Sequence, residues 1–138
     1  MGSLNEKQVV DSFTENLNKF SKLINEDNVR IYARELQIRT PDGEKKADLV
    51  LEIEDEKNTT PMANKMLVLE FKKGFIDNGA ASQVRRYADV VGKQLYRHKP
   101  ITSFIVGTDF SEHEIKMCRE LKVFPLQYDS KTGFMKIK

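Results

Sequence analysis

A run of apolar residues that ends in opposite charges, MLVLEFKK, occupies residues 66–73. A short apolar run of this kind is typical of a buried β-strand. Side chains alternate between the two faces of a strand, so we expect Glu70 and Lys72 to point to one side while Phe71 points into the core. A carboxylate and an ammonium group should therefore share one pocket at the end of this strand.

The preceding strand carries another acid toward the same place. Residues 47–53 alternate as a strand does, with leucine and isoleucine on one face and Asp48 on the other. Residues 40–43, Thr-Pro-Asp-Gly, precede this strand. We expect them to form a turn, because proline presets φ and glycine admits a positive φ. The polar residues 54–65 form the loop to the next strand. We expect two antiparallel neighbours that bring Asp48 and Glu70 together.

The remaining elements follow from apolar periodicity, turn residues and caps. Ser111 and Glu114 have the spacing of a capping box and begin a third helix, whose buried face includes Cys118. The order of elements, α-β-β-β-α-β-α-β-β, predicts an α/β fold with a mixed central sheet flanked by helices. The other predicted elements are a helix over 6–25, a strand over 29–38, a connection over 74–78, a helix over 80–95 capped by Asn78, and strands over 101–106, 123–128 and 134–137.

Length and composition restrict the class of protein. The chain has 138 residues, which suits a single domain over 1–138 with one core. Lys and Arg number 23 against 21 Asp and Glu, so any nucleic-acid contact must use a local basic patch. Cys118 is the only cysteine, which excludes an intrachain disulfide and a thiolate zinc cluster. With no apolar run long enough to span a membrane and no signal-peptide pattern, we expect a soluble, cytoplasmic protein.

The acids and the lysine suit phosphodiester hydrolysis. That reaction needs a cation to offset developing charge, an activated water, and a donor near the attacking or leaving oxygen. Hard Mg²⁺ accepts one or two carboxylates with a carbonyl and waters. Asp48, Glu70 and the backbone carbonyl of Phe71 form an adequate oxygen set, and Lys72 would stand beside the reacting phosphate or water.

The chain resembles the PD-(D/E)xK nuclease superfamily over residues 29–106. The resemblance rests on ADLV at 47–50, LEFK at 69–72 and QVRRY at 83–87. It implies a restriction-endonuclease-like αβββαβ core. The Gln-x-x-x-Tyr pattern of Gln83 and Tyr87 is similar to that of the RecB-type branch, where the Gln lies near the metal site and the Tyr supports it or contacts DNA. Lys73 departs from the Lys-Thr-Gly ending of that branch.

Several residues compete for secondary roles. Asp42, in a literal Pro-Asp pair, lies in a turn, so Asp48 is preferred as the acid of the motif. Glu6 on the first helix and Glu35 on the first strand are rival candidates for a further acid. Tyr87 also belongs to the apolar stripe of its helix, so packing is an alternative to a DNA contact. Arg85 and Arg86 are candidate phosphate contacts on that same helix, against the alternative of a solvated face.

The leading hypothesis is a Mg²⁺- or Mn²⁺-dependent deoxyribonuclease acting in DNA repair, recombination or the processing of viral or mobile-element DNA. Asp48 and Glu70 would bind the metal with Phe71, Lys72 would assist catalysis, and Gln83 would position the site. By analogy with small superfamily members such as junction resolvases, we expect a homodimer with two sites on one duplex. The alternatives are a catalytically silent nuclease-fold module that binds DNA or a protein, and a structural protein whose charged strand ends face solvent.

Overall fold

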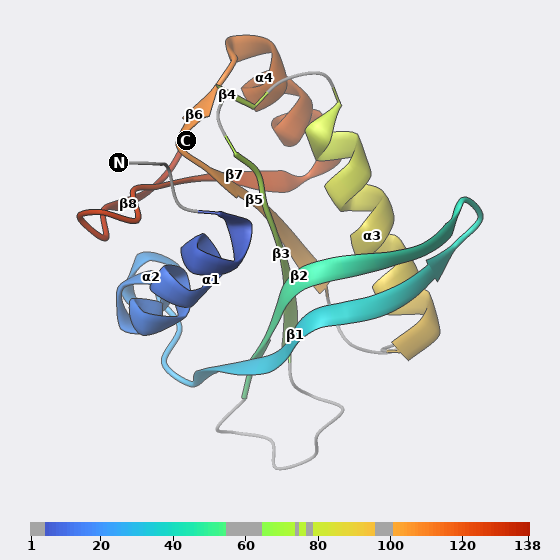
Figure 1. Cartoon of the computed structure of the whole chain (residues 1–138), viewed down its shortest axis with the longest axis horizontal. Helices are drawn as coiled ribbons and strands as arrows, with labels where there is room; N and C mark the ends of the chain where they lie inside the picture. Colours follow the sequence, from blue (N-terminus) through green and yellow to red (C-terminus); the bar gives the residue numbers. More distant parts are fainter. Residues whose placement is uncertain (1–4, 55–64, 74, 77–78, 96–100) are drawn as a thin grey trace.

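The computed structural model describes residues 5–54, 65–73, 75–76, 79–95 and 101–138, and Figure 1 shows the whole chain. The helices are α1 (Glu6–Glu15), α2 (Leu17–Leu23), α3 (Ala80–Leu95) and α4 (Glu112–Leu121). The strands are β1 (Val29–Thr40), β2 (Gly43–Ile53), β3 (Lys65–Phe71), β4 (Phe75–Ile76), β5 (Ile101–Gly107), β6 (Asp109–Phe110), β7 (Val123–Tyr128) and β8 (Met135–Ile137).

Six strands form one mixed sheet in the order β1-β2-β3-β5-β7-β8. The pairs β1/β2, β2/β3 and β7/β8 are antiparallel, whereas β3, β5 and β7 run parallel to one another. The predicted antiparallel pairing of the strands that carry Asp48 and Glu70 is therefore confirmed. Helix α3 supplies the crossover from β3 to its parallel neighbour β5.

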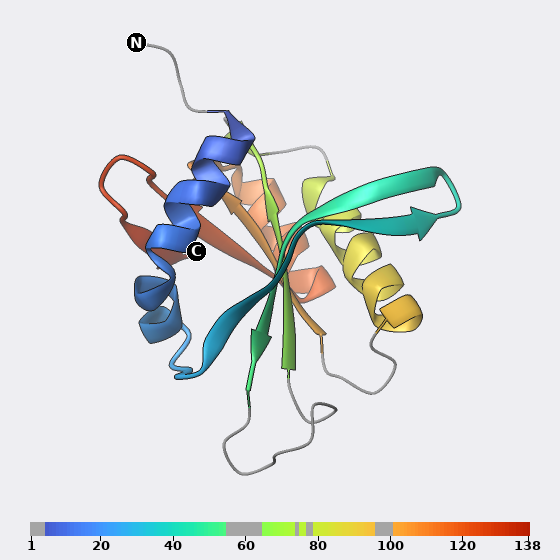
Figure 2. The same ribbon diagram turned by 60° about the horizontal axis from the view of Figure 1, so that its bottom comes forward.

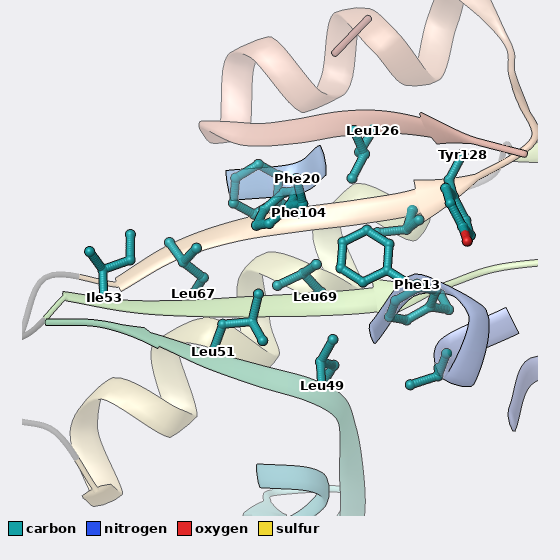
Figure 3. Packing of buried hydrophobic residues seen from close by; sticks show 13 residues of the cluster. Phe13, Phe20, Leu49, Leu51, Ile53, Leu67, Leu69, Phe104, Leu126 and Tyr128 are labelled. Carbon is teal, nitrogen blue, oxygen red and sulfur yellow. The ribbon is translucent and has the colours of Figure 1, made fainter. Parts of the chain in front are cut away.

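Helices cover both faces of this sheet. Figure 2 shows α1 and α2 on one side and α3 with α4 on the other. On the α1 side, Phe13 is fully buried and its ring contacts those of Phe20, Phe71 and Tyr128 at centroid distances of 5.2 to 5.4 Å. Figure 3 shows Phe13, Phe20 and Tyr128 of this cluster with the leucines of β2 and β3. The packing holds α1 over the carboxyl end of β3.

The opposite face is filled by aliphatic residues from the sheet and from α3 and α4. Val50 and Val68 pack with Tyr87 and Val91 of α3. Cys118 of α4 is fully buried in the neighbouring cluster, as predicted, and burial raises the pKa of its thiol to about 11. Such a thiol stays protonated and behaves as a small apolar side chain.

One predicted helix is wrong in its extent. The periodicity of residues 6–25 predicts a single helix, but the structure breaks it at Asn16 into α1 and α2. The Asn16 side chain donates a 3.0 Å hydrogen bond to the backbone carbonyl of Ser12, and its backbone, with φ −104° and ψ 24°, leaves the helical region. Asparagine competes for backbone groups in this way, which explains why apolar spacing alone did not locate the break.

The connection predicted over residues 74–78 contains a short strand. Strand β4 pairs in parallel with β6, and the two form a separate two-stranded sheet near the beginnings of α3 and α4. Two-residue strands have no detectable sequence period, which is why the pattern gave no sign of them. The predicted cap Asn78 lies outside the described residues.

The β1–β2 hairpin is longer than predicted, and its tip extends beyond the other strands of the sheet. Its strands continue to the turn at residues 40–43, where Gly43 has a φ of 112°. Glu35 has a left-handed φ of 51°, and the β1–β2 pairing shifts register between Ile31 and Ala33. Further along β1, Leu36 and Ile38 pack with the buried residues of α3, and Figure 1 shows the hairpin extending past α3. The backbone pairing of β2 with β3 ends at Leu49 and Leu69, one residue before Glu70.

No helix within the described ranges combines the length and the apolar composition needed to cross a lipid bilayer.

Candidate active site

Asp48 and Glu70 face each other where β2 separates from β3. The backbone ladder between these strands ends at the pair Leu49 and Leu69, and the next position in the same register places Asp48 opposite Glu70. Side-chain bonds replace the ladder there. The Phe71 N–H donates to Asp48 Oδ2 at 2.8 Å, and the Asp48 N–H donates to Glu70 Oε1 at 3.0 Å. The two carboxylates are thus held by each other's strand.

This arrangement places two like charges in a poorly solvated position. Glu70 is only 4% exposed, and Asp48 is half-buried. Burial, followed by the charge of Asp48, raises the pKa of Glu70 to about 9. Burial also raises the pKa of Asp48, and the hydrogen bond from the Phe71 N–H partly offsets this rise. Without a cation, the pair therefore favours retaining a proton.

Lys72 lies beside the carboxylates and is held by α3. Its backbone N–H donates to the carbonyl of Val106 at 2.8 Å, which continues the β3–β5 pairing by one residue. Its ammonium nitrogen donates to Gln83 Oε1 at 2.7 Å. The Gln83 amide in turn donates to the Tyr87 hydroxyl at 3.1 Å. A chain of polar contacts therefore runs from the end of β3 to the second turn of α3.

The ring of Tyr87 packs between α3 and the sheet, which is one of the two alternatives for this residue. It is 8% exposed and belongs to the apolar cluster between α3 and the sheet, so only its hydroxyl reaches the polar chain. This geometry suits a support for Gln83 better than a direct contact with a large ligand.

The donor set fits a hard divalent cation. Asp48 and Glu70 offer carboxylate oxygens. The raised pKa values of both groups show that their paired negative charges are not fully neutralised by the protein, and a bound cation would supply the missing positive charge. Among the described residues, no group of three or more acids, histidines and cysteines is placed to hold a metal ion. Mg²⁺ nevertheless needs only one or two carboxylates, because it keeps several waters. These residues could hold Mg²⁺ or Mn²⁺ with the carbonyl of Phe71.

A pocket of about 210 Å³ opens beside Asp48 on the α1 side of the site. Glu6 and Glu35, the two candidates for a further acid, both line this pocket. Neither forms a three-acid metal-binding group with Asp48 and Glu70. The pocket is lined by Glu6, Lys7, Val10, Arg34, Glu35 and Asp48. Lys7 was not identified from the sequence, where nothing in its helical spacing distinguishes it from other surface lysines.

The two rival acids both interact with Asp48 through charge. Burial and the charge of Asp48 raise the pKa of Glu6, and the nearby ammonium groups of Lys72 and Lys73 oppose that rise. Glu35 lies opposite Asp48 in the β1–β2 register, although its left-handed backbone interrupts the ladder, and its charge contributes to the raised pKa of Asp48. Both acids therefore border the candidate site.

The other predicted residues lie on the hairpin and α3. Asp42, at the tip of the hairpin, forms an exposed ion pair of 3.1 Å with Arg86. Arg85 forms an ion pair of 3.4 Å with Asp89 one turn further along α3. Asp42 is thus engaged in holding the hairpin to α3, and both arginines have acidic partners when no ligand is bound.

Glu114 is where the structure departs from the predicted capping box. The Ser111 hydroxyl accepts the Glu114 N–H at 2.9 Å, as expected, but the Ser111 N–H donates to the carbonyl of Ile76. The Glu114 carboxylate points instead to α3 and accepts the Ala81 N–H at 2.6 Å. Half of the predicted box is therefore formed, because a second helix terminus lies within reach of the glutamate.

The comparison with solved structures identifies the fold. A crystal structure of a repair endonuclease from Pyrococcus abyssi has a TM-score of 0.66 and 18% identity over 94% of this chain. The structure of EndoMS in complex with double-stranded DNA has a TM-score of 0.54 and 13% identity over 92% of this chain. The chain spans about half of each, 49% and 47% respectively. No protein-family model and no curated protein sequence matches it.

These similarities confirm the predicted fold class. The mixed six-stranded sheet with helices on both faces is the restriction-endonuclease-like fold expected from the sequence. Identities this low concern the fold and leave the chemistry to the residues of this chain.

Proposed function

We propose that this chain is a divalent-metal-dependent deoxyribonuclease that hydrolyses phosphodiester bonds of DNA. The observation that carries the proposal is the meeting of Asp48 and Glu70 where β2 leaves β3, with the Lys72 ammonium held beside them by Gln83. The endonuclease fold supports the same reaction class. A role in DNA repair, recombination or mobile-element DNA processing agrees with the fold.

Each residue has a distinct part in the proposed reaction. Asp48, Glu70 and the Phe71 carbonyl would hold Mg²⁺ or Mn²⁺, which supplies positive charge to a phosphate when bound. The Lys72 ammonium would donate to a phosphoryl oxygen on which negative charge develops. Gln83 would fix the direction of that ammonium, and Tyr87 would fix Gln83. The Lys72–Gln83–Tyr87 contacts support assignment to the RecB-type branch of the PD-(D/E)xK superfamily.

The test is cleavage of duplex, single-stranded and branched DNAs in Mg²⁺, in Mn²⁺ and in EDTA. We expect metal-dependent cleavage by the natural chain and a loss of at least about 100-fold in Glu70→Gln and in Lys72→Ala. Glu15→Gln and Lys136→Ala are matched controls, because they alter exposed residues of α1 and β8. Unchanged cleavage in the two site variants would refute the assignment.

The same assay separates the alternative of a silent binding module. Such a module would bind these DNAs in EDTA and leave them intact in both metals. The clustered carboxylates argue against such a module. Two buried carboxylates that disfavour each other's ionisation do not stabilise the fold unless a cation binds between them.

We also infer that the active form is a homodimer. One small domain with one site cuts one strand at a time, and a two-fold pair places two sites on a duplex. Light scattering of the chain with and without duplex DNA tests this inference. A single copy bound per duplex during double-strand cleavage would contradict it.

A further inference from the structure

Glu114 is a buried carboxylate that the proposed reaction does not use. It belongs to the first turn of α4 and has no exposed surface. A charged group is rarely buried in this way unless it is paired or fully hydrogen-bonded. Its surroundings therefore indicate what the carboxylate does.

The carboxylate binds the beginning of α3. Its two oxygens accept the Ala81 N–H at 2.6 Å and the Gly79 N–H at 3.4 Å. Backbone N–H groups at a helix N-terminus have no partner within the helix, and the helix dipole favours negative charge there. Gly79 has a φ of 86°, a left-handed conformation in which the chain turns into α3. Glu114 thus fixes both the turn and the first helical residues.

The same short segment carries Gln83. The Gln83 N–H donates to the Gly79 carbonyl at 3.2 Å, so the residue that Glu114 holds is hydrogen-bonded directly to Gln83. Gln83 Oε1 then accepts a hydrogen bond of 2.7 Å from the Lys72 ammonium nitrogen. Three hydrogen bonds, joined through the covalent structure of Gly79 and Gln83, therefore connect α4 to the lysine beside the carboxylate pair.

We propose that Glu114 is a positioning residue, which sets the direction of the Lys72 ammonium by anchoring the N-terminus of α3 from which Gln83 projects. This inference rests on the proposed nuclease function. It extends the candidate site to α4, which would act on the site through α3. Small displacements matter in such a chain, since a shift of about 1 Å in a positioned group can cost about 100-fold in rate.

The test compares Glu114→Gln with Glu112→Gln, which removes an exposed carboxylate from the same turn of α4. The glutamine amide can accept one N–H but presents its own N–H groups to the second donor, so the grip on α3 is lost in part. We expect kcat to fall about tenfold in Glu114→Gln while KM changes less than about twofold. Glu112→Gln should match the natural chain.

A double variant distinguishes positioning from general weakening of the fold. If Glu114 acts through Gln83, then adding Glu114→Gln to Gln83→Ala should cause no further loss of kcat. A kcat of Glu114→Gln within twofold of the natural chain, or an equal loss in both backgrounds, would overturn the proposal. If Glu114→Gln does not fold, Glu114→Asp takes its place. This variant keeps the charge but moves the carboxylate away from α3 by one methylene, and its kcat is measured in the same two backgrounds.

A spectroscopic readout makes the outcome independent of cleavage. The side-chain amide resonances of Gln83 in a ¹H–¹⁵N spectrum report its bonds to Lys72 and Tyr87. These resonances should shift in Glu114→Gln and stay unchanged in Glu112→Gln. Cleavage of no DNA by the natural chain would sink the proposed function alone, whereas unshifted Gln83 resonances would sink the link from Glu114.

Discussion

The backbone N–H of Asp48 donates a 3.0 Å hydrogen bond to the carboxylate of Glu70, 22 residues later in the chain. These two residues are direct cross-strand neighbours in register, and like charges in that relationship repel each other. The hydrogen bonds to the two carboxylates fix their place but do not remove the repulsion. The stability of the protein should therefore depend on what neutralises the pair.

The first prediction concerns pH in the absence of divalent metal. Glu70 has its pKa raised from 4.5 to about 9, so the folded state takes up a proton that the unfolded state releases. The stability contributed by protonated Glu70 is complete below about pH 4.5 and is lost as the pH rises toward about 9. Thermal unfolding in EDTA should show a fall in Tm over this window that is smaller in Glu70→Gln. An exposed-site control, Glu15→Gln, should keep the full fall, and an equal fall in all three proteins would contradict the assignment.

The second prediction concerns metal binding. At pH 8, Mn²⁺ at about 100 times its dissociation constant should raise the free energy of unfolding by about 2.7 kcal/mol, because it binds only the folded chain. Asp48→Asn should remove most of this gain, since the variant loses one of two carboxylates. Thermal shift with Mn²⁺ titration measures both. Equal shifts in Asp48→Asn and the natural chain would place the ion elsewhere.

The third prediction concerns the hydroxyl of Tyr87. Tyr87→Phe keeps the packed ring and removes the acceptor of the Gln83 amide, so stability should fall by only about 1 kcal/mol. We expect kcat to fall several-fold and KM to stay constant, because Gln83 loses its orientation toward Lys72. In a Gln83→Ala background the hydroxyl has no amide to hold, and its removal should leave kcat unchanged. A further fall in that background would point to a direct contact of Tyr87 with DNA.

The fourth prediction concerns the ion pair at the hairpin tip. Asp42→Asn should leave stability within about 1 kcal/mol, because both partners are exposed. It frees the guanidinium of Arg86 for a phosphate, so duplex binding in EDTA should strengthen, with a steeper dependence on salt. Arg86→Ala should weaken binding and flatten that dependence by about one unit of slope. If both variants bind like the natural chain at every salt concentration, Arg86 serves only to hold the hairpin.

Local patterns were sufficient for the antiparallel pair β2–β3 and for the meeting of its two acids. The alternation around Asp48 and the apolar run that ends in Glu70 specify two strands, and the polar loop between them allows an antiparallel pair. Convergence of the two acids then follows, because strands of this length and register have few ways to pair. The break at Asn16 was missed, since one asparagine changes the path of a helix without changing its apolar spacing.

The contacts that complete the site depend on segments distant in sequence. Spacing places Gln83 and Tyr87 on one helix face, but only the packing of α3 on β3 brings Gln83 within 2.7 Å of the Lys72 nitrogen. Asp42 reaches Arg86 because the β1–β2 hairpin packs on α3, where Ile38 joins the cluster of Tyr87 and Val91.

Glu114 shows the physical reason for this division. From the sequence, its carboxylate has a local partner in the Ser111 N–H, three residues away, and the capping box follows. In the folded chain the N-terminus of α3 lies within reach and offers two N–H groups, while Ile76 satisfies Ser111. Backbone periodicity is a local property that the amino-acid order determines, whereas the choice among competing hydrogen-bond partners is made by the packing of whole elements.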